Sequence, residues 1–71
     1  MTKMTKVEQT LASLRDNVEL FMDDQWGQVY LDNARLPGQS VHEFRAHLST
    51  LSRQGLYKPE GDDCFGYVRF D

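Results

Sequence analysis

At 71 residues, the chain has room for one domain with one modest apolar core, and 39% apolar residues are typical of globular proteins rather than disordered tails. The net charge of -3 argues against a general affinity for nucleic acid, because phosphate binding needs concentrated Lys and Arg. A single cysteine, Cys64, excludes an intramolecular disulfide, and no apolar run is long enough for a membrane span or a signal peptide. We therefore expect one soluble cytoplasmic domain over residues 1–71, with a disordered tail at 1–4.

The N-terminal segment carries the signals of an amphipathic helix. Thr5 and Glu8 have the spacing of a capping box, in which each side chain accepts from the other residue's amide. Apolar residues then recur at steps of four and three, which places them on one helical face. They are Val7, Leu11, Leu14, Val18 and Phe21. Because this repeat is too short for a coiled coil, we expect the face to pack in a core, in a helix that ends near Met22.

The next segment predicts a strand followed by turns. Trp26 precedes a run at 28–31 whose β-branched and aromatic residues favour extended structure. Turn-forming residues at 32–39 predict a loop or a short second strand.

A second helix is expected between residues 40 and 54. Ser40 and Glu43 repeat the N-cap spacing, and Gly55 supplies the left-handed residue that commonly ends a helix. The apolar face of this helix comprises Phe44, Leu48 and Leu51, and Leu56 would close a Schellman motif.

The C-terminal segment predicts a β-hairpin around the acidic turn 60–63. Pro59 lacks an amide donor, so it should lie at a strand end or a sheet edge. Two-residue alternation places Val68 and Phe70 toward the helices. The predicted fold is therefore α+β, with two amphipathic helices packed on a small antiparallel sheet that ends in this hairpin.

The order of helix, strand, capped helix, "GLYKP", acidic turn and "FGYVRF" resembles the winged-helix family of DNA-binding domains over roughly residues 5–70. The resemblance implies that the helix at 40–54 enters the major groove and that the hairpin at 56–70 is the wing. It also implies DNA contacts from side chains that can bind phosphates or base edges. These are His42, Arg45, Ser49, Ser52 and Arg53 of the helix and Lys58 and Arg69 of the hairpin.

Two features depart from the winged-helix pattern. Only eight residues separate Leu31, the end of the expected strand, from Ser40, so the helix that normally comes before the reading helix is missing or reduced to a turn. The expected wing tip carries Glu60, Asp62 and Asp63, which would repel a phosphate backbone. We expect the likeness to lie in architecture more than in function, since folds host many functions.

Catalytic and metal-binding patterns are not found in the sequence. His42 and His47 are separated by about 140° around a helix, so they are poorly placed to share a metal, and we expect His47 to be half-buried and hydrogen-bonded. Cys64 has no CxxC partner and the adjacent aspartates lie in predicted turns, so structural and solvated roles are favoured. We therefore expect no enzymatic activity, cofactor or small-molecule substrate.

The aromatic residues give the leading functional hypothesis. Six of them lie in or beside predicted strands, and so small a sheet cannot bury all six on one face. Exposed aromatic side chains anchor protein interfaces and can also stack on single-stranded bases, whereas an open alternative is that they only cover the second face of the sheet. The six are Trp26, Tyr30, Tyr57, Phe65, Tyr67 and Phe70.

Our leading hypothesis is a small binding module that docks on a protein partner, or on a second copy, through aromatic and acidic surface. In style such a chain resembles small phage and plasmid proteins that act by occupying another macromolecule. The predicted contact residues are Trp26, Tyr30, Tyr57, Asp62, Asp63 and Tyr67. The alternative is a winged-helix-like, DNA-binding transcriptional regulator that uses the helix and wing residues given above.

Overall fold

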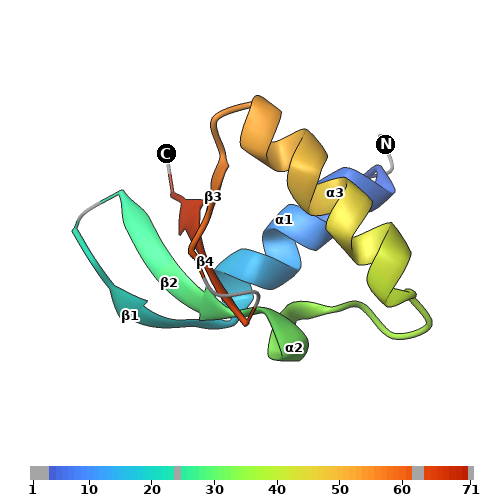
Figure 1. Cartoon of the computed structure of the whole chain (residues 1–71), viewed down its shortest axis with the longest axis horizontal. Helices are drawn as coiled ribbons and strands as arrows, with labels where there is room; N and C mark the ends of the chain where they lie inside the picture. The colour runs from blue at the N-terminus through green and yellow to red at the C-terminus, as the bar shows by residue number, and fades with distance from the viewer. Residues whose placement is uncertain (1–3, 24, 62–63, 71) are drawn as a thin grey trace.

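The computed structural model describes residues 4–23, 25–61 and 64–70, and it has the predicted α+β architecture. Within these residues the helices are α1 (Lys6–Asp16), α2 (Leu31–Ala34) and α3 (Val41–Arg53). The strands are β1 (Val18–Phe21), β2 (Trp26–Tyr30), β3 (Tyr57–Pro59) and β4 (Phe65–Arg69). They form one antiparallel sheet in the order β1-β2-β4-β3, as Figure 1 shows. Of the tail expected at residues 1–4, only the exposed Met4 falls within the described residues.

Helix α1 begins where its capping box predicts. The Thr5 hydroxyl accepts from the Glu8 amide at 3.1 Å, and the Glu8 carboxylate accepts from the Thr5 amide at 2.9 Å. Because both halves of the box are made, two amides of the first turn have partners.

The predicted end of this helix near Met22 is wrong. Helix α1 stops at Asp16, where the Asn17 side chain donates to the Ser13 carbonyl at 2.8 Å, and the chain then enters strand β1. The four-and-three spacing continued through Val18 and Phe21, but pairing with β2 overrides that local signal. Val18 still packs on the core, as a strand residue.

The segment that was expected to be a loop or a short strand contains the single helical turn α2. The Leu31 amide at its start donates to the Cys64 carbonyl at 2.9 Å, which ties this turn to the beginning of β4. A loop then leads to α3.

The predicted boundaries of α3 are confirmed. The Ser40 hydroxyl accepts from the Glu43 amide at 3.0 Å at the start of the helix. At its end Gly55 has a φ of 78°, and the Leu56 amide donates to the Leu51 carbonyl at 2.9 Å. These are the bonds of a Schellman ending, which directs the chain into β3.

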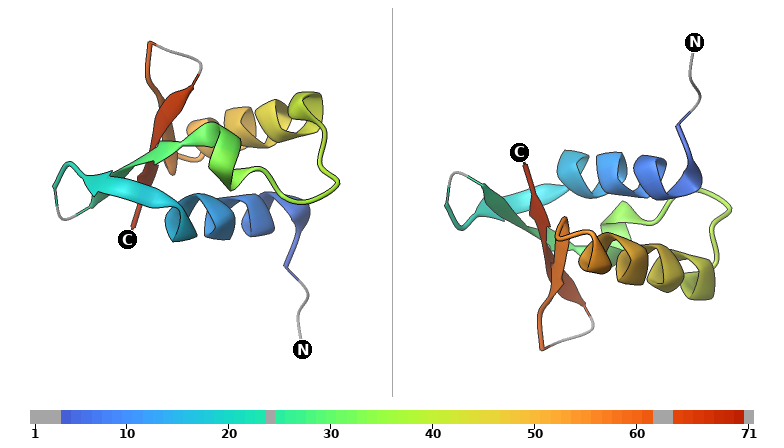
Figure 2. Two further views of the ribbon diagram at one scale, coloured as in Figure 1. Left: turned by 90° about the horizontal axis from the view of Figure 1, so that it is seen from below. Right: turned by 90° about the horizontal axis from the view of Figure 1, so that it is seen from above.

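The core lies between the helices and one face of the sheet. Helices α1 and α3 lie side by side; α1 contacts β2 and β4, and α3 contacts β3 (Figure 2). The predicted apolar face of α3 and Val68 are buried here, and Phe70 is partly buried. The buried apolar residues are Leu14, Val29, Leu31, Ala34, Phe44, Leu48, Leu51, Tyr57 and Val68.

The central strands β2 and β4 fit together by size. Each has a glycine at its second position and a valine at its fourth. In the antiparallel register Gly27 pairs with Val68, and Val29 pairs with Gly66, so each valine lies opposite a glycine. Because Gly27 and Gly66 have no side chains, they leave room for the core side chains that pack over them.

A buried polar cluster joins α1, α3 and the loop between α2 and α3. The Gln39 side-chain Nε2 lies 3.2 Å from the Thr10 hydroxyl and 2.9 Å from His47 Nδ1, and the Leu36 backbone amide donates to the Gln39 side-chain Oε1 at 3.1 Å. The prediction of a half-buried, hydrogen-bonded His47 is thus confirmed. Among the described residues, every buried side-chain nitrogen or oxygen has a hydrogen-bond partner.

Candidate docking surface

The sheet has one covered face and one open face. Gly27, Val29, Gly66 and Val68 are buried on the side where α1 and α3 pack. Because successive side chains of a strand point to opposite sides, the residues between them point away from the helices. We call this second side the outer face. It carries Trp26, Gln28, Tyr30, Lys58, Phe65, Tyr67 and Arg69.

Strand register arranges the outer face in three rows. Trp26 lies opposite Arg69 at one end, and Tyr30 lies opposite Phe65 at the other. Between them, Tyr67 has Gln28 on one side and Lys58 on the other. Backbone pairing therefore fixes where each of these aromatic residues stands on the outer face.

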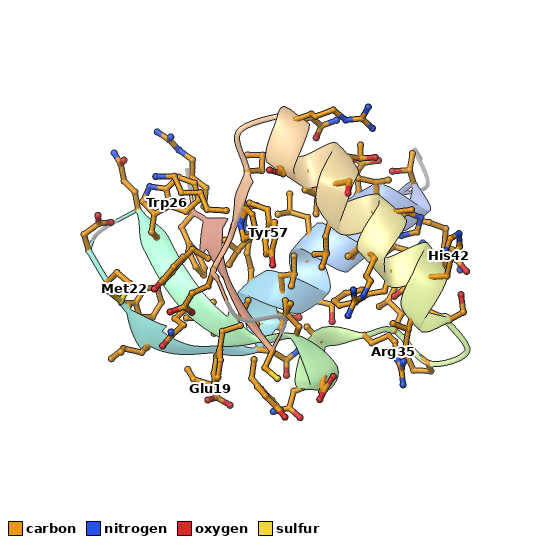
Figure 3. The ribbon with its side chains drawn as sticks, in the orientation of Figure 1. Glu19, Met22, Trp26, Arg35, His42 and Tyr57 are labelled. Carbon is orange, nitrogen blue, oxygen red and sulfur yellow. The ribbon has the colours of Figure 1, made fainter. Side chains whose placement is uncertain are left out.

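The end of the outer face at Trp26 is cationic. The Lys58 ammonium lies 4.4 Å from the indole centroid, and the Arg69 guanidinium carbon lies 5.6 Å from it. Both are within the range of cation–π attraction. Figure 3 shows Trp26 beside Met22 at the β1–β2 hairpin.

The end of the outer face at Tyr30 is acidic. The Tyr30 and Phe65 rings pack with their centroids 5.2 Å apart. A side-chain hydrogen bond with Asp32 is the main reason that the pKa of Tyr30 is raised, and the negative charge of Asp32 raises it further.

Glu60 extends the acidic end toward the middle row. It accepts from the Gln28 side chain at 3.1 Å. Loss of hydration raises the pKa of Tyr67 above its usual range, and the charge of Glu60 and a hydrogen bond to it raise this pKa further.

Leu20 of strand β1 and Met22, which directly follows the strand, are exposed apolar side chains that sequence reasoning missed, because it assigned them to a helix. Leu20 is 56% exposed and Met22 is 55% exposed. Leu20 pairs with Gln28 and so extends the middle row of the outer face. Met22 borders a shallow hollow of about 230 Å³ together with Trp26 and Tyr67.

The structure brings Trp26, Tyr30 and Tyr67 of the predicted protein-binding set together on the outer face. Tyr57 is a correction, because it lies on the opposite side of the sheet, is only 5% exposed and belongs to the core. The alternation of β3 turns Lys58 outward, and its neighbour Tyr57 therefore faces α3. Asp62 and Asp63 lie outside the described residues.

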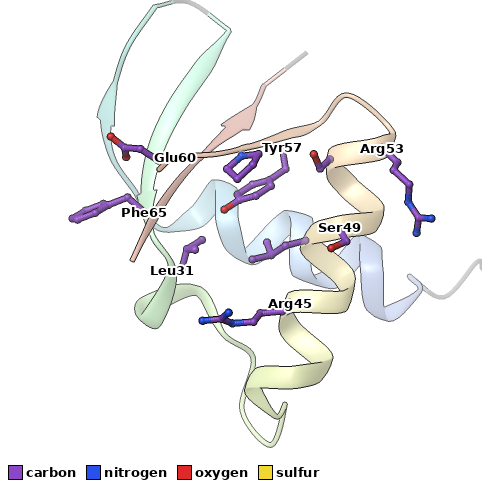
Figure 4. A pocket seen from close by; sticks show the side chains of 10 residues that line it. Leu31, Arg45, Ser49, Arg53, Tyr57, Glu60 and Phe65 are labelled. Carbon is purple, nitrogen blue, oxygen red and sulfur yellow. The ribbon is translucent and has the colours of Figure 1, made fainter. Parts of the chain in front are cut away.

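The predicted DNA-binding residues are divided between two surfaces. Arg45, Ser49, Ser52 and Arg53 of α3 line a groove of about 720 Å³ between this helix and the hairpin, where Arg45 points toward Leu31 (Figure 4). The other wall of the groove contains Glu60, Pro59 and Phe65.

The remaining members of the DNA-binding set do not join this groove. Lys58 and Arg69 lie on the outer face beside Trp26, because the strand alternation turns them away from α3. His42 is exposed at the start of α3 and does not line the groove (Figure 3). The helix and wing residues therefore do not form one continuous surface.

The remaining polar candidates have structural partners or show no metal geometry. The Asp23 carboxylate accepts from the amides of Gln25 and Trp26 at 2.8 and 2.9 Å, so it holds the β1–β2 turn. Residues 4–23, 25–61 and 64–70 contain no group of three or more side chains placed to hold a metal. None of the helices in these ranges is long and apolar enough to cross a bilayer.

No family model, curated protein or solved structure matches the chain.

Proposed function

We propose that this chain is a non-enzymatic binding module that docks on a protein through the outer face of its sheet. The observation that carries the proposal is the row arrangement of Trp26, Tyr30, Phe65 and Tyr67 on the side of the sheet opposite its buried glycines and valines. Aromatic side chains that are held rigidly and flanked by charge are the usual anchors of protein interfaces. Occupying the partner's surface is the module's mechanism.

The fold supports this role by keeping the two faces separate. Helices α1 and α3 bury the side chains of the inner face. The aromatic residues of the outer face do not belong to this core. Charges at both ends of the face steer association and select the orientation of the partner. The single cysteine fits a reducing compartment such as the cytoplasm, where we place the module.

The proposal is tested by affinity capture from a lysate of the native host, with the wild-type chain and two double variants as baits. Trp26→Ser with Tyr67→Ser should lose the captured protein, because both anchors are removed from the outer face. Arg45→Ala with Arg53→Ala, on the opposite side of the sheet, should keep it. Retention of the same protein by the Trp26/Tyr67 variant would contradict the proposal.

DNA binding through α3 is the second candidate, and it is favoured by the way Arg45, Ser49 and Arg53 line one groove. In that case the Arg45→Ala and Arg53→Ala variants should abolish binding to duplex DNA, and the logarithm of the wild-type affinity should fall linearly with the logarithm of salt concentration. Absent or salt-independent binding would remove this candidate. Glu60 lines the same groove, and its negative charge, which would repel DNA phosphates, weighs against DNA binding.

A further inference from the structure

The two ends of the outer face carry opposite charge. Lys58 and Arg69 flank Trp26 at one end. At the other end, Asp32 directly follows Tyr30 in the first turn of α2, and Glu60 reaches the middle row, where it accepts from the Gln28 side chain at 3.1 Å. A face with this polarity complements a copy of itself turned end to end, because each cationic end then meets an acidic end.

We infer that the outer face binds a second copy of this chain, with the two sheets stacked face to face and their strands reversed by a two-fold axis that runs across them. The inference rests on the proposed function, because it uses the same surface and names its partner. A closed two-fold contact is the commonest symmetry of protein oligomers, and it uses one patch on both subunits.

The direction of the axis follows from the charges. A two-fold axis in the interface that runs across the strands places the Trp26 row of one copy over the Tyr30 row of the other. An axis along the strands would instead place like charges opposite each other, which is unfavourable. Only the axis across the strands brings the cationic end of each copy to the acidic end of the other.

One pair of residues can report on this arrangement directly. Lys58 and Glu60 lie on the same edge of the sheet, and the Lys58 ammonium reaches the Trp26 row, 4.4 Å from the indole centroid. Glu60 lies two residues further along the hairpin, toward the row of Tyr30 and Phe65. When the strands are reversed, Lys58 of each copy lies over Glu60 of the other.

The aromatic side chains of the outer face suit such a contact. Packed sheets lie about 10 Å apart, a spacing that aromatic side chains from two facing layers can fill. The four aromatic residues of the outer face would form the dry centre, and the charged residues its rim.

Charge-swap variants test the inference by sedimentation equilibrium of purified protein. The wild-type chain should form a dimer that weakens as salt is raised. Lys58→Glu and Glu60→Lys should each raise the dimer dissociation constant by at least about tenfold, because each places like charges opposite one another twice. An equimolar mixture of the two variants should recover the dimer, since the heterodimer has complementary charges at both contacts.

Lys6→Glu on α1 is the matched control, because it makes the same charge change away from the sheet and should leave the dimer unchanged. Amide hydrogen exchange of β2 and β4 in each monomeric variant verifies that it is folded. A wild-type chain that stays monomeric at millimolar concentration would overturn the inference. Single variants that still dimerise, or a mixture that stays monomeric, would overturn it as well.

This experiment separates the inference from the proposed function. A monomeric wild-type chain that still captures another protein through Trp26 and Tyr67 would leave the proposed function in place and remove only the self-association. A wild-type dimer that is unaffected by both charge changes would show that self-association uses another surface.

Discussion

The ring of Tyr57 lies against Gly66 on the neighbouring strand, in the space that a β-carbon on Gly66 would occupy. Tyr57 is buried there, and Pro59 two residues later pairs with Gly66 at the edge of the sheet. This contact joins the hairpin to the helices, because Tyr57 belongs to the same core as Leu48 and Leu51 of α3.

Gly66→Ala should therefore destabilise the protein by about 1–3 kcal/mol, because the added methyl group overpacks the core. Gly61→Ala is the matched control, since a β-carbon at Gly61 meets nothing within 4 Å. We expect the control to lie within about 0.5 kcal/mol of wild type in urea unfolding. Equal effects of the two substitutions would contradict the described packing of Tyr57.

Thr10→Val tests the buried polar cluster. The Thr10 hydroxyl donates to the Lys6 carbonyl at 2.9 Å and accepts from Gln39, and valine keeps its shape without the hydroxyl. We expect a loss of about 1–2 kcal/mol in the free energy of unfolding. Thr50→Val makes the same change at a helical site whose hydroxyl is exposed, and it should cost less than about 0.5 kcal/mol.

Ser40→Ala should remove about 1 kcal/mol of stability through loss of the N-cap of α3. Amide exchange of Glu43 should accelerate in this variant, because its amide loses the Ser40 hydroxyl as acceptor. Ser52→Ala, within the same helix and exposed, should be neutral or slightly stabilising, since alanine has the higher helix propensity. Unchanged exchange at Glu43 would show that the cap is not formed.

The outer tyrosines predict how stability depends on alkaline pH. The pKa values of Tyr30 and Tyr67 are raised above 10.0 in the folded chain. The stability from this shift is complete below the ordinary pKa and is lost as the pH rises through the folded values, because the unfolded chain ionises first.

Glu60→Gln should lower the pKa of Tyr67 toward its ordinary value and leave that of Tyr30 in place, whereas Asp32→Asn should do the reverse. NMR titration of the tyrosine ring carbons measures both pKa values in one experiment. If the pKa of Tyr67 is unchanged by Glu60→Gln and the pKa of Tyr30 is unchanged by Asp32→Asn, the described acidic end of the outer face is wrong.

The helix boundaries set by short-range hydrogen bonds were predictable from sequence. Thr5, Ser40 and Gly55 act within three or four residues of their own positions, so their signals need no knowledge of the rest of the chain. The end of α1 was not predictable in this way, because residues 18–21 fit a helical stripe and become a strand only through pairing with β2.

The candidate docking surface was partly predictable. Alternation within β2 places Trp26 and Tyr30 on one side, but it does not say which side the helices cover. The position of Lys58 and Arg69 beside Trp26 depends on the register among three strands. A glycine and a valine at matching positions of β2 and β4 were the signal that would have given the register of these two strands, whereas the register of β3 goes with the Tyr57 ring that lies over Gly66.

Photo-crosslinking in the native host tests the central claim, that the outer face is the docking surface, most directly. A photoreactive phenylalanine analogue would replace Tyr67 in one variant, and Lys6 on α1 or Ser52 on α3 in two others. We predict covalent protein adducts from position 67 and none from positions 6 and 52. Adducts that form only from position 6 or 52, or none from position 67, would contradict the claim.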